Sequence, residues 1–314
     1  MKDILRLCSR SGIKDPQIER IKGDMSLRQI YRINHIHGSL VGVHGENIKE
    51  NEAFLSFRDS FEESGFNVPK LYSVSADLKT YILEDLGDMT VKAFCDKSAE
   101  VGDISSVKEV YRRIIELLPR IQTELYDKTD YSKCYQGDIF DRHAMEKDVS
   151  RFEEYFLQKY HKDHDPSKFA AFREGIISEA DRQSKDFFMY RDFQTRNIMI
   201  KNEELYFIDF QSGRRGSFYY DLSSFIYSSG TINYEGMERE LCGVYFNSAK
   251  HISSDPEEFE KILKVFACLR IMQAAGNYAF YYFSRDDMTI RSNYSRTISL
   301  LRSLSRELGY TSFI

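Results

Sequence analysis

Cysteine, proline and tryptophan are scarce in this chain of 314 residues, which has five cysteines, five prolines and no tryptophan. The cysteines are odd in number and scattered, and no two of them form a C-x-x-C pair. This pattern argues against a disulfide framework and against a cysteine-ligated zinc site. We therefore expect reduced thiols and a cytoplasmic location.

Long hydrophobic runs are also missing. The longest uncharged stretch, 271–284, contains Gln273 and Asn277 and is too short and too polar for a transmembrane helix. Charged residues interrupt the first residues, 1–6, which is unlike a signal peptide. The net charge of −5 does not favour binding to nucleic acid or to an anionic membrane surface, so we expect neither partner.

Several common catalytic and nucleotide-binding motifs are absent as well. No Gly-Lys dipeptide occurs, which excludes a P-loop. There is no G-x-G-x-x-G after a strand pattern, no H-E-x-x-H and no G-x-S-x-G. The function must therefore be sought in other residue patterns.

The hydrophobic periodicity changes near residue 87. Before it, short alternating runs predict strands around one helix that opens at residue 52, and after it a period of three to four residues predicts helices. The expected strands are 30–33, 39–43, 71–74 and 80–85, and the expected helices beyond them include 107–125, 151–160 and 259–283. We predict a mixed α/β (α+β) fold with a small β-rich lobe, 1–86, and a larger helical lobe, 87–314. A cleft between two such lobes is a common ligand site.

Three polar residues in the second half form the most informative pattern. Asp192 lies between apolar flanks, Asn197 follows five residues later, and Asp209 ends a short strand seventeen residues after Asp192 (209 − 192). The apolar runs on either side of the turn at 201–204 predict a β-hairpin. Because a hairpin holds its two flanking loops at one end, we expect the three side chains to converge.

This set of side chains suits phosphoryl transfer. Mg²⁺ prefers hard oxygen ligands, which the Asp209 carboxylate and the Asn197 amide can supply. Asp192 can orient an attacking hydroxyl and accept its proton. A D-x-x-x-x-N motif followed by an aspartate at a strand end is the protein-kinase-like catalytic set.

The residues around this set resemble a known superfamily. Tyr-Arg-Asp-Phe-Gln-Thr-Arg-Asn-Ile-Met at 190–199, followed by Ile-Asp-Phe-Gln at 208–211, resembles the aminoglycoside phosphotransferase/choline kinase superfamily, which keeps a kinase fold and phosphorylates small molecules. Within it, the chain is most similar to the N-acetylmuramate/N-acetylglucosamine 1-kinase group of cell-wall recycling. The segments that carry this narrower similarity are 23–32, 67–69 with 83–87, Gln211 and 216–224.

The resemblance implies a two-lobed protein-kinase-like fold, ATP and Mg²⁺ as cofactors, and an amino sugar as the acceptor. It makes Asp192 the catalytic base and gives Asn197 and Asp209 to the metal. Residues 1–86 become the nucleotide-binding lobe, and 87–314 become the catalytic and substrate-binding lobe. The implied nucleotide contacts are Gly23, Asp24, Met25, Ser26, Arg28 and the backbone of Glu84 and Leu86.

The resemblance also implies supporting and acceptor-binding residues. Asp221 would hold Arg191 behind the catalytic loop, and Glu52 takes the place of the helix glutamate that pairs with a strand lysine. The implied acceptor-binding residues are Asp141, Arg142, Asp148 and Arg270. Because an unpaired buried charge is costly, Arg270 must be paired or line a cavity. Its partner is then Asp148 or a substrate carboxylate, or it forms a structural ion pair between helices.

The chain departs from the superfamily pattern at two places. Tyr190 stands where a histidine is usual, and either ring can pack under the loop and form a hydrogen bond. The phosphate-binding lysine of the third strand is missing from 40–44. Arg28, Arg32 and Lys49 are the candidate replacements.

Two other functions remain open. The chain could be a kinase of the same fold for another small hydroxyl acceptor, such as an aminoglycoside, choline or a hydroxy-amino acid. The missing lysine also permits a catalytically weak, nucleotide-binding regulator. The sequence does not indicate an oligomeric state.

Overall fold

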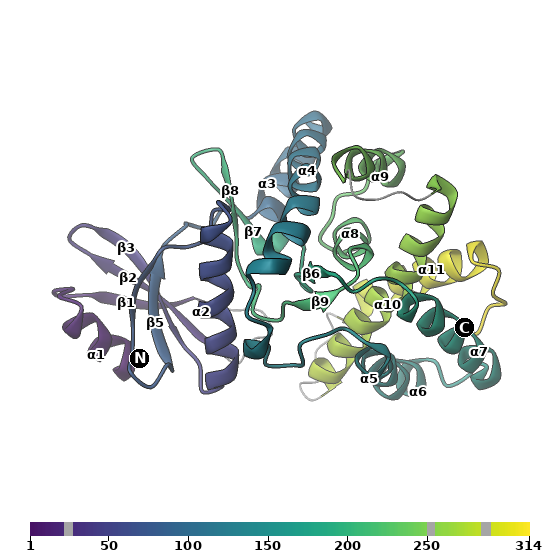
Figure 1. Ribbon diagram of the computed structural model, residues 1–314, viewed down its shortest axis with the longest axis horizontal. Helices are drawn as coiled ribbons and strands as arrows, with labels where there is room; N and C mark the ends of the chain where they lie inside the picture. The colour runs from purple at the N-terminus through teal and green to yellow at the C-terminus, as the bar shows by residue number, and fades with distance from the viewer. Residues whose placement is uncertain (22–27, 250–254, 284–289) are drawn as a thin grey trace.

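The computed structural model describes residues 1–21, 28–249, 255–283 and 290–314. A β-sheet with two helices lies at one end of the long axis, and a larger helical part fills the other end (Figure 1). This is the two-lobed α/β architecture that the sequence predicts. The predicted boundary after Leu86 falls in the connection between the last sheet strand and the first helix of the larger part.

The N-terminal part is built on one antiparallel sheet with the strand order β1-β2-β3-β5-β4. The four strands that the sequence predicts are present, and β1 and the first helix are additions. Its elements are α1 (Lys2–Arg10), β1 (Gln17–Ile21), β2 (Gln29–His35), β3 (Gly38–His44), α2 (Ile48–Glu63), β4 (Leu71–Val74) and β5 (Thr80–Glu84).

The two faces of this sheet have different partners. Helix α1 covers one face through a small apolar cluster that includes Ile4, Ile33 and Ile82. The helix approaches so closely that a Cβ at Gly42 would lie 2.9 Å from both Ile4 Cδ1 and Ile33 Cδ1. On the other face, Val41 and Val43 line a large cavity.

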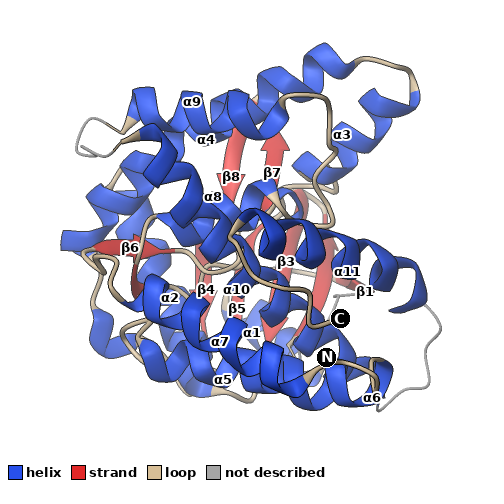
Figure 2. Ribbon diagram, turned by 90° about the vertical axis from the view of Figure 1, so that its right-hand side faces the viewer, coloured by secondary structure: helices blue, strands red, loops and turns tan. Residues whose placement is uncertain are grey.

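The C-terminal part is mostly helical, with two short antiparallel ladders, β6–β9 and β7–β8, inside it. Figure 2 shows helices surrounding these strands. The helices are α3 (Val91–Glu100), α4 (Ile104–Lys128), α5 (Arg142–Phe152), α6 (Gln158–Tyr160), α7 (Pro166–Asp181), α8 (Tyr219–Ile226), α9 (Met237–Ser248), α10 (Pro256–Phe283) and α11 (Ile290–Glu307), with single turns at Tyr131–Lys133, Glu153–Leu157 and Thr195–Asn197. The strands are β6 (Phe187–Met189), β7 (Ile198–Lys201), β8 (Glu204–Phe207) and β9 (Arg214–Gly216).

Helix α10 is the long buried helix that the sequence predicts, and it contacts α5, α7, α8 and α11. Helix α5 starts at Arg142, well before the helix predicted at 151–160, because the Asp141 side chain caps it by accepting from the Ala144 N–H. Within the described ranges, no helix is both long and apolar enough to cross a bilayer.

The two ladders position the residues of interest. The predicted hairpin is present as β7–β8, with Ile198 opposite Phe207. Its two turn residues, Asn202 and Glu203, both have positive φ, which matches the twist of a tight hairpin. Strand β6 pairs with β9, so the loop after β6 and the loop before β9 lie together.

Candidate active site

A cavity of about 1140 Å³ lies between the sheet and the helical part. Its wall includes Asp192, Asn197 and Asp209, together with Arg28 from the sheet and Arg270 from α10. The three residues that the sequence places together by spacing therefore share one cavity. These roles stay predictions, and the geometry describes what each side chain can do.

Asp221 fixes the start of the catalytic loop. It is fully buried at the start of α8, and its two carboxylate oxygens accept from the backbone N–H groups of Tyr190 (2.7 Å) and Arg191 (2.9 Å). Burial raises the pKa of Asp221 to about 7, although these two bonds act in the opposite direction. Arg191 has φ of 80°, an unusual value for a residue with a side chain, and the Asp221 clamp holds the loop there.

Tyr190 connects the two catalytic segments. Its ring is fully buried, and its hydroxyl donates to the backbone carbonyl oxygen of Ile208, directly before Asp209. Phe210 on the other side of Asp209 stacks on Phe54 and Phe61 of α2, with ring centroids 5.1 Å and 4.7 Å away. The loop that carries Asp209 is therefore attached to both parts of the molecule.

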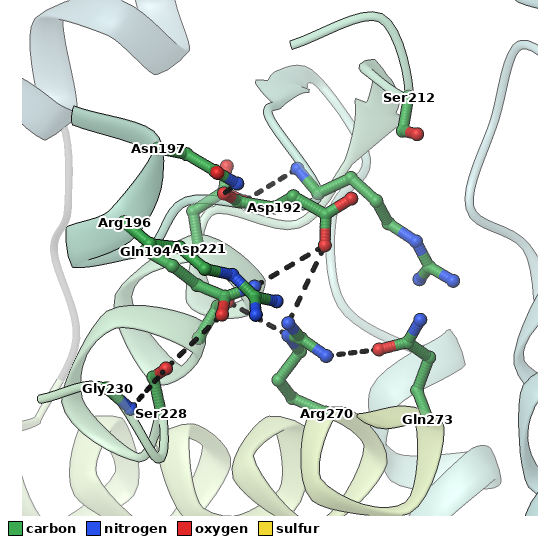
Figure 3. A network of polar contacts seen from close by, with 12 residues as sticks. Asp192, Gln194, Arg196, Asn197, Ser212, Asp221, Ser228, Gly230, Arg270 and Gln273 are labelled. Carbon is green, nitrogen blue, oxygen red and sulfur yellow. Dashed lines mark hydrogen bonds and ion pairs between the residues drawn. The ribbon is translucent and has the colours of Figure 1, made fainter. Parts of the chain in front are cut away.

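About 30% of the Asp192 side chain is exposed, compared with 38% of the Asp209 side chain, so both carboxylates are accessible from the cavity. Arg270 Nη2 lies 3.6 Å from Asp192 Oδ1, and Gln194 Nε2 lies 3.5 Å from the same oxygen (Figure 3). Gln194 in turn accepts from Ser228, and Arg270 donates to Gln273, so the network fixes Asp192 from one side. Among the described residues, none donates a hydrogen bond to Asp192 Oδ2, so this oxygen can face an acceptor hydroxyl.

Asn197 and Asp209 present unused oxygens to the cavity. The Asn197 Nδ2 donates to the Asp192 carbonyl oxygen (2.8 Å), which leaves the amide oxygen free of that bond. The Asn197 carbonyl oxygen accepts from the Ile208 N–H (3.1 Å), and Asp209 follows with φ of 65°. These are hard oxygen donors of the kind that Mg²⁺ prefers. No set of three or more His, Cys, Asp or Glu side chains in the described part of the chain could hold a metal by itself.

Asp209 already neutralises a cation from the sheet. Its Oδ1 accepts from Arg28 Nη2 at 2.6 Å and from Gln211 Nε2 at 2.9 Å. Burial acts to raise the pKa of the Asp209 carboxyl, but the charge of Arg28 and the hydrogen bonds from Gln211 and Arg28 outweigh it and lower the pKa below its usual value. Asp209 is therefore ionised and ready to bind a cation.

Among the candidate replacements for the strand lysine, Arg28 is the one that lies beside Asp209, at 2.6 Å. The cavity face of β3 carries Val41 and Val43, so no cation can come from that strand. Arg28 directly precedes β2, and its Nε lies 3.4 Å from Glu50 Oε1 on α2. Alternation along the strand also puts Ile30 and Arg32 on the cavity face, as their place in the cavity wall shows.

The expectation for Glu52 is corrected. Glu50 is the α2 glutamate beside Arg28, whereas Glu52 lies 3.9 Å from Lys133 and does not line the cavity. One helical turn holds 3.6 residues, so positions 50 and 52 face different directions. The sequence identified the correct helix but not its face.

Arg32 and Lys201 bind the connection between the two parts. Arg32 donates to Asp85 (2.7 Å) and Asp88 (2.8 Å), and Lys201 of the hairpin donates to Glu84 (2.6 Å). Arg32, in the middle of β2, is thus engaged with carboxylates other than Asp209. Leu86 and Glu84 line the cavity as expected, but the Glu84 N–H already donates to the Lys70 carbonyl oxygen, so only other backbone atoms there can meet an adenine ring.

The predicted acceptor residues divide into two groups. Asp141, Asp148 and Arg270 line the cavity, and Arg142 does not. Arg142 points to Glu146 and to Glu174 of α7, at 2.9 Å and 2.6 Å, so its expected contact with the acceptor is wrong.

The partner expected for Arg270 is also different. Asp148 pairs with Arg191 at 2.6 Å, and Arg270 reaches Asp192 instead. Arg270 also donates to Ser224 (2.9 Å). A buried arginine on α10 thus lies beside Asp192, the predicted catalytic base.

Sequence reasoning missed Gln136, Tyr135 and Ser212 on the acceptor side, and it considered Arg214 only together with Arg215, as side chains that either reach a substrate phosphate or flank the loop. Arg214, Gln136, Tyr135 and Ser212 line the cavity and are linked by hydrogen bonds. Tyr135, Gln136 and Ser212 lie in turns, outside the helices and strands, so no hydrophobic periodicity indicates them. Gly23, Asp24, Met25 and Ser26, predicted to cover the phosphates, lie outside the described residues.

Known proteins share this architecture. The choline kinase LicA of Streptococcus pneumoniae matches with a TM-score of 0.66 at 14% identity, covering 96% of this chain and 99% of that one. The amicoumacin kinase hAmiN, solved with AMP-PNP and Ca²⁺, matches with a TM-score of 0.63 at 11% identity, covering 98% and 92%. At these identities the matches establish a common fold, that of choline kinases and aminoglycoside phosphotransferases, as the sequence resemblance predicts.

Two sequence comparisons add to this. An N-acetylmuramate/N-acetylglucosamine kinase of Neisseria meningitidis serogroup B is 23% identical over 254 residues, which are 76% of this chain and 71% of that protein. The model of the ecdysteroid kinase-like family matches residues 44–254. This range contains Asp192, Asn197, Asp209 and Asp221 and covers well over half of the chain. The chain therefore belongs to the ecdysteroid kinase-like family.

Proposed function

We propose that this protein transfers the γ-phosphoryl group of ATP to a hydroxyl of a small molecule. The observation that carries the proposal is the presence of Asp192, Asn197, Asp209 and Arg28 on the wall of one cavity. A catalytic base, two oxygen ligands for a metal and a cation for phosphate are the parts that phosphoryl transfer requires. The kinase-like family and the shared kinase fold agree with this chemistry.

Asp192 is the group that acts on the acceptor. Its free carboxylate oxygen accepts a hydrogen bond from the acceptor hydroxyl and takes the proton as the oxygen attacks the γ-phosphorus. The new P–O bond forms as the bond to the leaving ADP oxygen breaks. Arg270 and Gln194 hold the other oxygen, which restricts the carboxylate to one orientation.

Asn197 and Asp209 fit a Mg²⁺ ion. Each contributes a hard oxygen, and Mg²⁺ in phosphoryl-transfer sites takes one or two protein carboxylates with phosphate oxygens and water. When bound, Mg²⁺ neutralises negative charge on the phosphates. Arg28 pairs with both Asp209 and Glu50 and lines the cavity, which places its charge where the phosphates would lie.

The acceptor we propose is an N-acetylated amino sugar, phosphorylated at its anomeric hydroxyl. The support is the similarity to the meningococcal N-acetylmuramate/N-acetylglucosamine kinase over 254 residues. Choline is the second candidate, because a choline kinase shares the fold across nearly the whole chain.

A panel of acceptors tests the proposal. ATP consumption with Mg²⁺ is measured against N-acetylmuramate, N-acetylglucosamine, free hexoses, choline and kanamycin, and phosphorus NMR identifies the product. Asp192→Asn serves as the blank. An anomeric phosphate on an N-acetyl sugar supports the full proposal, and transfer to choline or kanamycin alone refutes the sugar.

The regulator alternative predicts a different result. ATP would then raise the melting temperature, and no acceptor would consume it. Failure of every acceptor, with Asp192→Asn indistinguishable from the unmodified protein, would refute phosphoryl transfer.

A further inference from the structure

Arg214 is a buried cation on the acceptor side of the cavity. It begins β9, is only 3% exposed and lines the cavity wall. Its guanidinium donates three hydrogen bonds to neutral oxygens: the Ser212 carbonyl (3.2 Å), the Gln136 carbonyl (3.1 Å) and the Gln136 side-chain amide (2.8 Å). A guanidinium has five N–H groups, so two remain unused. No carboxylate of the described residues forms an ion pair with it.

The charges near Arg214 leave its positive charge further from being neutralised. Arg191 is also buried, and it already holds Asp148 through a 2.6 Å hydrogen bond. Asp148 is the carboxylate that attracts Arg214, so two buried guanidinium groups share one acid. Burial and the charge of Arg191 lower the pKa of Arg214 to about 10, so it stays protonated at neutral pH.

The two sides of the cavity therefore differ in charge. On the nucleotide side, Arg28 faces both Glu50 and Asp209. On the acceptor side, Arg214 has neutral partners, and Arg270 shares Asp192 with the reacting hydroxyl. An unpaired buried charge is costly, and an anion bound beside it removes that cost.

Two hydroxyl groups stand beside this cation. Tyr135 Oη lies 3.2 Å from Ser212 Oγ, and Gln136 donates to Tyr135 at 2.7 Å. Both hydroxyl residues line the cavity that Asp192 also lines. The cluster of Arg214, Tyr135 and Ser212 thus lies within reach of an acceptor whose hydroxyl meets Asp192.

We propose that the acceptor carries a carboxylate and that Arg214 binds it, with the Tyr135 and Ser212 hydroxyls beside it. This inference rests on the proposed phosphotransferase function and names the chemical class of its acceptor. The lactyl group of N-acetylmuramate is a carboxylate of this kind. At this cluster the charge of Arg214 repels an ammonium group, such as those of choline and of aminoglycosides, although the carboxylates of Asp141 and Asp148 line the same cavity.

A matched set of ligands tests, without any mutation, whether the negative charge of the acceptor contributes to its binding. Calorimetry in the presence of AMP-PNP and Mg²⁺ compares N-acetylmuramate, its uncharged methyl ester and N-acetylglucosamine. The acid should bind at least 10-fold more tightly than the ester, because a hydrogen bond to a charged group contributes roughly 10- to 100-fold in affinity. An ester that binds as tightly as the acid, or an acid that does not bind, overturns the inference.

Variants assign the effect to Arg214. Arg214→Gln should reduce the preference for the acid over the ester by roughly 10-fold or more, and Arg214→Lys should retain part of it because the charge remains. Arg215→Gln is the matched control, since the neighbouring arginine pairs with Asp138 and does not line the cavity. Equal weakening of acid and ester in Arg214→Gln would show that Arg214 only supports the loop at Gln136.

The outcomes separate this inference from the proposed function. Tight binding of the acid without phosphoryl transfer to any acceptor supports the anion site and refutes the kinase reaction. Phosphoryl transfer with no preference for the acid refutes the anion site and leaves the kinase reaction in place.

Discussion

The catalytic centre and the acceptor side of the same cavity are assembled in different ways. Asp192, Asn197 and Asp209 come from one stretch of eighteen residues that a single hairpin closes (192 to 209 inclusive). The acceptor side combines Gln136 and Asp148 with Arg270, which follows them by more than a hundred residues in the sequence. A short segment can be interpreted from spacing alone, because local strand pairing decides which side chains meet. Distant segments meet only through packing.

The largest expected effect tests the segment 192–209. Asp192→Asn keeps the shape of the side chain but removes the base, so kcat should fall about 10²- to 10⁴-fold while the KM for ATP changes little. Steady-state ATP consumption measures both values. Asp163→Asn, on an exposed loop, is the control, and it should behave like the unmodified protein. Near-normal turnover in Asp192→Asn would remove Asp192 from the chemistry.

The next effect tests the clamp beneath the catalytic loop. Asp221→Ala leaves the N–H groups of Tyr190 and Arg191 without their acceptor, so the free energy of unfolding should fall by about 2–5 kcal/mol. Asp221→Asn keeps one acceptor oxygen and should lose less. Urea unfolding followed by circular dichroism gives both values. If the two variants are as stable as the unmodified protein, Asp221 does not hold the loop.

Arg28, directly before strand β2, contacts Asp209 in the segment 192–209. Arg28→Gln should raise the KM for ATP and lower kcat, together about 10- to 100-fold in kcat/KM, because charge-assisted bonds to phosphate are lost. Arg28→Lys should recover part of the loss, since a point charge remains. Arg20→Gln, on the exposed face of β1, is the matched control. An unchanged KM for ATP in Arg28→Gln would show that another cation meets the phosphates.

The smallest expected effect concerns Arg142. The sequence predicts that it contacts the acceptor, whereas the structure pairs it with Glu146 and Glu174. Arg142→Gln breaks exposed ion pairs to Glu146 and Glu174 and should cost about 0.2–1 kcal/mol of stability. The KM for the acceptor should not change, because Arg142 points away from the cavity. A several-fold rise in that KM would restore the sequence-based role of Arg142 and weaken the comparison.

The same division appears in the fold. Strands β2 to β5 and the long helix α10 follow from hydrophobic alternation and helical periodicity, so the sequence predicts them. Strand β1, helix α1 and the ladder β6–β9 are short or polar and become regular only against their neighbours. Helix α5 began earlier than predicted because the Asp141 cap was not recognised as a start.

The contacts of single side chains in the site also depend on packing. Glu52 was expected beside the phosphate-binding cation, and Glu50 is there instead, because the exact face of α2 depends on how the helix packs. Asp148 is one of the partners that the sequence allows for Arg270, and it pairs with Arg191 instead, because α5, α10 and the loop at 190–192 meet in three dimensions.

By itself, the sequence determined the catalytic spacing, the hairpin and the absence of a strand lysine, since each depends on residues close together in the chain. Only the tertiary structure decided that Arg28 meets Glu50 and Asp209, that Arg270 reaches Asp192, and that Arg214 is buried with no ion-pair partner in the described part of the chain. Those contacts depend on how helices and the sheet pack against one another, and packing brings together side chains that no local pattern connects.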